Sequence, residues 1–131
     1  MKNVSRFVVG LTFVGVLVAA GARPVLAQDS VKVAPDKCKV LFENEVVRVY
    51  EFTLKPGEKM PMHSHPQTSI YSLTDSKLSI TVAGGKPEPA EFKAGQAYYH
   101  GPVTHGGVNT GTTDTRLIIT EIKAPRSKTQ K

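Results

Sequence analysis

The residues of this chain that are best suited to chemistry are its four histidines, which fall into two separate clusters. Residues i and i+2 of a strand point to the same face, so His63 and His65 would project two imidazoles side by side. That is the spacing of two metal ligands from one strand, and His105, in a Gly-rich turn, is the candidate third. Three neutral imidazoles suit iron, zinc, copper or nickel and leave coordination positions open for water or substrate.

Two other interpretations of the histidine pair have to be weighed against this three-histidine metal site. A lone His-x-His pair is also common on protein surfaces, where it binds nothing. Met60 and Met62 precede the pair, and soft thioethers beside imidazoles are typical of Cu(I) handling. Strict alternation places Met62 on the face opposite His63 and His65, however, which favours simple packing.

The elements that must position these side chains are strands, because the chain consists of short β-type runs broken by turn residues. Residues 46–54 and 115–122 are rich in β-branched and aromatic side chains, and residues 78–82 alternate apolar with polar. Gly84-Gly85 follows with a hairpin signal. Arg48 and Arg116 lie in mid-strand, where a solvent-facing position is the default and binding of a carboxylate substrate the alternative. About eight short strands and no sustained helical periodicity predict an all-β antiparallel sandwich or barrel.

The basic character of the chain belongs to its ends. The 131 residues carry a formal net charge of +6, but residues 1–27 hold three basic and no acidic residues, and the last nine hold four and none. The body between them is close to neutral, without a basic cluster or an aromatic platform, so we expect no nucleic-acid partner. The single cysteine, Cys38, excludes an internal disulfide framework and a multi-cysteine zinc site. It either bridges to another chain or is buried as a small apolar side chain.

The N-terminal segment 1–27 has the organisation of a secretory signal peptide. Lys2 and Arg6 precede the uncharged apolar run Phe7–Ala20, and small side chains before Gln28 mark a cleavage site. The run is shorter than the roughly 20 residues that span a membrane. We therefore expect an exported, periplasmic or extracellular protein with no stable membrane insertion after cleavage. The expected parts are the signal peptide (1–27), a lead-in (28–37), one domain (38–122) and a basic disordered tail (123–131).

Both histidine clusters lie within a longer pattern. Gly57 is followed by five residues and then His63-x-His65; Gly95, Pro102, His105, three residues and Asn109 follow downstream. This resembles the two-motif signature of the cupin superfamily, and the Pro-x-His-x-His-Pro stretch at 61–66 is similar to that of small single-domain bacterial cupins. The resemblance covers roughly residues 38–122. It implies a small antiparallel β-barrel or jelly roll in which His63, His65 and His105 bind a divalent transition metal, and it implies a possible homodimer.

The sequence departs from that pattern at the position of the usual glutamate ligand. Ser69 or Ile70 stands there, no acid occurs between Glu58 and Asp75, and the second motif is one residue short. The implied ligand set is therefore three histidines plus water or an unusual fourth ligand. Gln67 and His100 are the candidates for that ligand, and Tyr99 could line the pocket beside His100.

Three functions follow as hypotheses, the third being a structural or interaction role for a degenerate barrel without an active site. The first is an exported metal-dependent enzyme acting on a small molecule, of the dioxygenase, lyase or isomerase type, with the catalytic residues unidentified. The second is a non-catalytic module that binds a metal or a small ligand in the barrel. Nothing in the sequence identifies the substrate.

Overall fold

The structure is a computed structural model that describes residues 28–123. The predicted signal peptide and all but the first residue of the predicted tail lie outside the described residues. Within them, one short helix precedes nine strands, as predicted for an all-β chain. These elements are α1 (Ser30–Val33), β1 (Cys38–Glu43), β2 (Val47–Leu54), β3 (Lys59–His65), β4 (Gln67–Ser72), β5 (Ser76–Val82), β6 (Pro87–Phe92), β7 (Ala97–His100), β8 (Val103–Asn109) and β9 (Thr115–Ile122). None of the described helices is long and apolar enough to cross a membrane.

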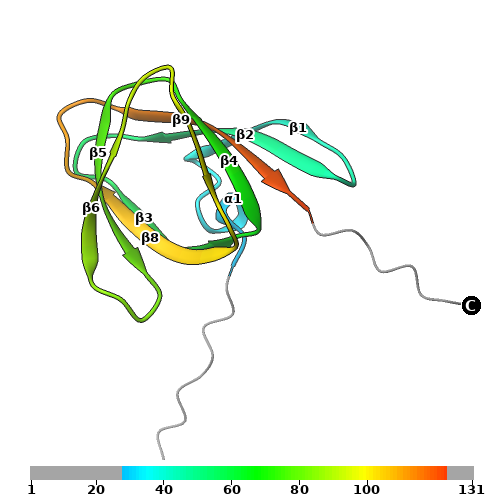
Figure 1. The fold of residues 1–131 in the computed structure, drawn as a ribbon, viewed down its shortest axis with the longest axis horizontal. Helices are drawn as coiled ribbons and strands as arrows, with labels where there is room; N and C mark the ends of the chain where they lie inside the picture. Colours follow the sequence, from blue (N-terminus) through cyan, green and yellow to red (C-terminus); the bar gives the residue numbers. More distant parts are fainter. Residues whose placement is uncertain (1–27, 124–131) are drawn as a thin grey trace, which may run out of the picture.

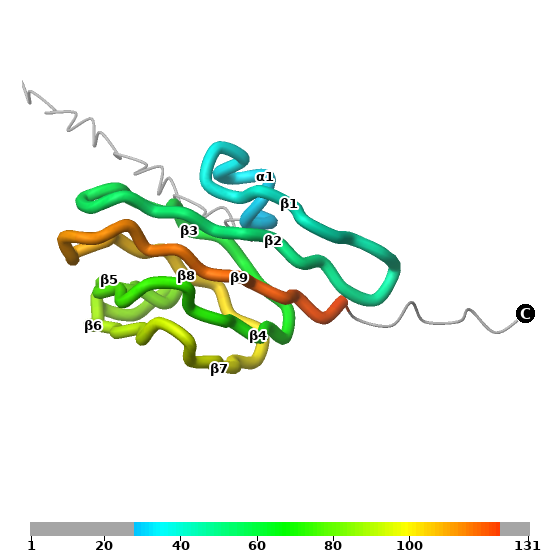
Figure 2. Tube along the Cα trace, turned by 90° about the horizontal axis from the view of Figure 1, so that it is seen from above, coloured from blue at the N-terminus to red at the C-terminus, as the bar shows by residue number. Residues whose placement is uncertain are grey.

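The strands form two antiparallel sheets. One has the order β1-β2-β9-β4-β7 and the other the order β3-β8-β5-β6. Seen end-on, the strands surround a common interior, while the β1–β2 hairpin extends to one side (Figure 1). In the perpendicular view, α1 packs beside β1 at the outer edge of the sheet that contains β1 (Figure 2). No strand is shared between the two sheets in the described part of the chain, so the barrel is not closed by hydrogen bonds.

Alternating side chains fill the space between the sheets. In β4 and β9 nearly every second residue is buried, as expected for strands with one face on the core. The core contains Tyr50, Phe52, Leu54, Met60, Ile70, Leu78, Leu117 and Ile119, together with Ala34 at the end of α1 and Cys38 at the start of β1. Burial raises the pKa of the Cys38 thiol to about 12, so this cysteine is an inert apolar side chain.

The hairpin turn predicted at Gly84-Gly85 is present between β5 and β6. Gly84 has a φ of 77°, a left-handed conformation that costs glycine little and other residues more. The hairpin brings β6 against β5 at the edge of its sheet, from Ser76 paired with Phe92 to Thr81 paired with Pro87. Phe92 then reaches inward to pack against the core.

Candidate metal centre

Two neighbouring strands of one sheet carry the three predicted ligands. His63 and His65 lie on β3, β8 runs antiparallel beside it, and His63 pairs directly with His105. The prediction that His105 lies in a Gly-rich turn is wrong, because Val103–Asn109 forms a strand that pairs with both β3 and β5. His63 and His65 are buried and His105 is half-buried. Strand register therefore brings His105, which is distant in the sequence, next to the histidine pair.

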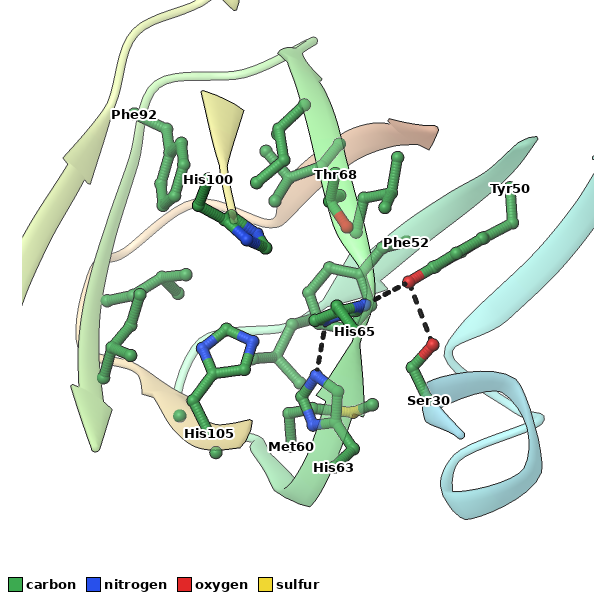
Figure 3. A pocket seen from close by; sticks show the side chains of 18 residues that line it. Ser30, Tyr50, Phe52, Met60, His63, His65, Thr68, Phe92, His100 and His105 are labelled. Atoms are coloured by element: carbon green, nitrogen blue, oxygen red, sulfur yellow. Dashed lines mark hydrogen bonds between the residues drawn. The ribbon is translucent and has the colours of Figure 1, made fainter. Parts of the chain in front are cut away.

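The three imidazole rings face one another inside the fold (Figure 3). The Nε2 atoms of His63 and His65 are 2.8 Å apart. The ring centroid of His105 lies 4.7 Å from that of His63 and 5.2 Å from that of His65. One nitrogen from each ring can be chosen so that all three lie within 4.8 Å of one another, an arrangement compatible with one bound metal ion.

Hydrogen bonds on the far side of two rings fix which nitrogen faces inward. His63 Nδ1 lies 2.7 Å from the carbonyl oxygen of Pro61, and His65 Nδ1 lies 2.7 Å from Oε1 of Glu121. Both partners accept, so both Nδ1 atoms donate, and in the neutral rings both Nε2 atoms present lone pairs to each other. Two lone pairs in such close contact repel unless a proton or a metal ion lies between them. The donor set therefore fits a cation.

The third histidine also has a buried nitrogen that is left for a cation. His105 Nε2 is buried and has no hydrogen-bond partner among the described residues, which is unusual for a buried polar atom. Burial, followed by the neighbouring histidines, lowers the pKa of His105 to about 3, and burial also lowers the pKa of His63. Both rings are therefore neutral at pH 7, which is the form that binds metal.

Behind His65 lies a buried ionic network that the sequence analysis missed. Glu121 is 2% exposed and contacts Arg48 Nε at 2.9 Å, and Arg48 reaches Asp29 Oδ2 at 2.7 Å. Burial raises the pKa of Glu121, but the hydrogen bonds from His65 and Arg48 outweigh it, so that the pKa lies below its usual value and the group is a carboxylate. Arg48 is thus neither solvent-facing nor free for a substrate. The signal for Glu121 was its place in the alternation of β9, two residues after the buried Ile119.

Two hydroxyl groups complete this network. Tyr50, fully buried on β2, lies 3.3 Å from Glu121 Oε1 and 3.4 Å from His65 Nδ1. The Tyr50 hydroxyl also lies 2.9 Å from Oγ of Ser30, which opens α1 (Figure 3). The N-terminal segment therefore contributes directly to the surroundings of the histidines.

A cavity of about 60 Å³ lies beside the three rings. It has room for a metal ion with a few waters or for a ligand of a few non-hydrogen atoms. Its walls are mainly apolar and include Phe52, Leu54, Ile70, Leu78, Phe92 and Leu117.

Of the three candidates for a fourth ligand or pocket residue, the structure brings only His100 to the cavity. His100 lies on β7 across the cavity from the other histidines, with its ring centroid 5.8 Å from that of His65. Gln67 and Tyr99 are exposed, Tyr99 at 64%, because each occupies an outward position in the alternation of its strand. Neither of them lines the cavity.

Comparison with solved structures identifies the fold of this chain. No family model and no curated protein matches the sequence. Among solved structures, a cupin domain protein from Bordetella pertussis Tohama I is 26% identical over 66% of this chain and 92% of its own, with a TM-score of 0.61. An RmlC-like cupin family protein with a double-stranded β-helix fold from Methanocaldococcus jannaschii is 17% identical over 65% of this chain and 77% of its own, with a TM-score of 0.53. A cupin superfamily protein from Desulfitobacterium hafniense DCB-2 is 11% identical over 66% of this chain and 76% of its own, with a TM-score of 0.52.

In this chain, the three histidines of the cupin-like motifs converge on the inner side of the two antiparallel sheets. The chain therefore has the fold of the cupin superfamily.

Proposed function

We propose that this chain is an exported cupin that binds a divalent transition metal through His63, His65 and His105 and acts on a small molecule at that metal. The observation that carries the proposal is the convergence of inward nitrogens from two strands, with Nδ1 of His63 and His65 each held by an acceptor outside the site. Such outer partners orient ligating histidines in metalloproteins. Export rests on the signal-like segment 1–27.

The residues around the rings suit a reaction on a small, largely apolar substrate. Bound metal would supply Lewis acidity or activation of dioxygen at its open positions. Apart from the histidines, no ionisable side chain except the Tyr50 phenol is among the described residues that line the cavity, so nothing there selects a charged substrate. The lining is mainly apolar, and polar interactions are stronger in surroundings of low dielectric constant.

His100 is the residue placed to move a proton. Its Nδ1 lies 2.8 Å from the carbonyl oxygen of Gly101, to which it donates, so in the neutral form of the ring the lone pair is on Nε2. The side chain lines the cavity from β7, whereas the metal-binding rings come from β3 and β8. We assign it the role of general base toward a substrate bound in this cavity.

Metal analysis tests the first half of the proposal. The full chain, purified without a histidine tag, should carry close to one equivalent of a transition metal, and replacement of all three ligands by alanine should abolish it. Less than about a tenth of an equivalent in the folded wild-type protein, before and after metal reconstitution, contradicts the proposal.

The second candidate function is a non-catalytic binding module. The small volume of the cavity favours it, because a substrate of more than a few atoms needs side chains to move. Assays of oxygen uptake and of a panel of small organic substrates separate the two. Turnover that is lost in His100→Ala with metal content unchanged supports the enzyme, and metal binding without any turnover supports the module.

A further inference from the structure

The lining of the cavity contains one heteroatom that is neither an imidazole nitrogen nor held by a hydrogen bond. Its hydroxyl groups are engaged: Ser30 and Tyr50 bond each other, and Thr68 Oγ1 donates to the carbonyl oxygen of Pro66 at 2.8 Å. Glu121 lies behind His65 and does not line the cavity. Among the described lining side chains, this leaves the thioether sulfur of Met60.

A bulge in β3 places Met60 on the same side as the histidines. The pairing of β3 with β8 shifts between Met60, which is opposite Gly107, and His63, which is opposite His105. As a result Met60 is 5% exposed and lines the cavity, whereas Met62 is 39% exposed. Figure 3 shows the Met60 side chain behind the ring of His63, on the strand that carries His63 and His65.

The neighbouring strand leaves room for this bulge. A Cβ atom at Gly106 would lie 3.0 Å from the carbonyl oxygen of Met60 and 3.3 Å from the amide nitrogen of Met62. A side chain at residue 106 would require the backbone of β3 to move away by a few tenths of an ångström. Opposite Met60 itself stands Gly107, which likewise lines the cavity.

Three imidazoles and a thioether, without a carboxylate, form a soft donor set. We propose that the site is a copper site in which Met60 contributes the soft donor and Cu(I) is the preferred state. This inference rests on the three-histidine site of the proposed function and replaces its divalent ion with monovalent copper as the preferred occupant. Thioethers select Cu(I), imidazoles accept copper, and hard oxygen-preferring ions have no carboxylate ligand here. The apolar lining adds to the preference, because moving an ion from water into apolar surroundings costs less for a single charge than for a double charge.

The experiment compares the two methionines that precede the histidine pair on β3. Cu(I) affinity of the full chain is measured anaerobically by competition with bathocuproine disulfonate, and Zn²⁺ affinity by competition with a Zn²⁺ chelator. Met60→Leu should weaken Cu(I) binding by about tenfold or more and leave Zn²⁺ binding within about threefold. Met62→Leu, the matched control, should change neither.

A spectroscopic measurement keeps the proposal testable if Met60→Leu does not fold. Selenomethionine-labelled Met62→Leu protein, loaded with Cu(I), should show copper–selenium scattering in X-ray absorption.

The outcomes separate this inference from the proposed function. Unchanged Cu(I) affinity in folded Met60→Leu, or absence of copper–selenium scattering, overturns the role of Met60, with the three-histidine site intact. A wild-type protein that binds Zn²⁺ but not Cu(I) overturns the choice of copper. A protein that binds neither metal contradicts the proposed function itself.

Discussion

The residue that decides the electrostatics of the centre is Glu121, on the far side of His65. Three neutral imidazoles leave the full charge of a bound ion uncompensated, and the cavity walls offer no carboxylate among the described residues. Glu121 supplies a negative charge through the ring of His65, at 2.7 Å from Nδ1. Arg48 and Asp29 extend this to a trio with one net negative charge, which complements a cation among the histidines.

Removing that charge should weaken metal binding without removing a ligand. Glu121→Gln keeps the shape of the side chain but not the carboxylate that accepts from Nδ1 of His65. We expect Zn²⁺ affinity to fall by about 10- to 100-fold, measured by chelator competition. Glu51→Gln, which breaks the surface pair with Arg116, is the control and should bind Zn²⁺ like the wild type. Equal affinity in folded Glu121→Gln and wild type would show that Glu121 is structural only.

At the scale of elements, the approach of β3 to β8 is the most constrained feature of the centre. Three of the donors discussed above, those of Met60, His63 and His65, lie on β3, and the bulge sets their directions. The bulge depends on Gly106, whose missing side chain admits the Met60 carbonyl. Strand pairing and donor geometry are therefore coupled at one glycine.

Gly106→Ala tests this coupling. The added methyl group would lie 3.0 Å from backbone that has no flexible end to move away, so β3 must shift. We expect the free energy of unfolding to fall by about 1–3 kcal/mol in urea denaturation, as for other overpacked sites. Gly101→Ala is the control, because a Cβ there meets nothing within 4 Å. If both alanine variants are equally stable, the close approach carries no strain.

How far the sequence predicts these elements depends on how regular they are. Alternation and turn residues suffice for β2, β5 and β9, and the His-x-His spacing suffices for His63 and His65. Alternation alone would place Met60 on the face opposite the histidines, but the bulge inserts one extra residue into β3 and brings Met60 to their face. Alternation also failed to show β8, since Gly106 and Gly107 weaken a strand pattern that pairing with β3 and β5 sustains. Glu121 was missed because its partners Arg48 and His65 lie 73 and 56 positions away.

The N-terminal segment is an element of the site as well as of the fold. Asp29 accepts hydrogen bonds from the amides of Val31 and Lys32 and so caps α1, and it pairs with Arg48. The amide of Ser64, between two ligands, donates to the carbonyl oxygen of Gln28 at 2.9 Å. The lead-in predicted from the sequence as a mere polar stretch thus holds β3 and the Glu121 network in place.

Asp29→Asn isolates the ion pair in this segment, since asparagine is an equally good helix cap. Burial raises the pKa of Asp29, but the hydrogen bond and charge of Arg48 outweigh it and hold the pKa below 3.8. A carboxyl group with a lowered folded pKa stabilises above its unfolded pKa and less as the pH falls through the folded one. We expect the variant to be less stable by about 1 kcal/mol at pH 7, with the difference shrinking below pH 3.8. Urea denaturation across pH measures it, and Asp36→Asn, in an exposed pair with Lys37, is the control. A difference that stays constant down to pH 2 would contradict the ion-pair origin.

At the scale of the whole molecule, the centre joins two sheets that share no strand among the described residues. The ligands come from β3 and β8 of one sheet, whereas Glu121 and Arg48 come from β9 and β2 of the other. His65 is the link, because its ring faces the metal position with one nitrogen and Glu121 with the other. A metal bound to His65 polarises the ring and strengthens that link. Metal binding should therefore stabilise both sheets and not only the one that holds the ligands.

Thermal unfolding and hydrogen exchange test this coupling. Zn²⁺ at about 100 times its dissociation constant should stabilise the fold by about 2.7 kcal/mol. For a domain of this size that raises Tm by roughly 10 to 20 °C, and removal of the metal with a chelator should reverse the increase.

Amides of β9 and β2 should gain protection from hydrogen exchange together with those of β3 and β8. In Glu121→Gln at saturating Zn²⁺, protection of β3 and β8 should persist while that of β9 and β2 falls, since the link between the sheets is weakened. Protection confined to β3 and β8 in the wild type would instead mean that the metal acts within a single sheet and that the ionic network is independent of it.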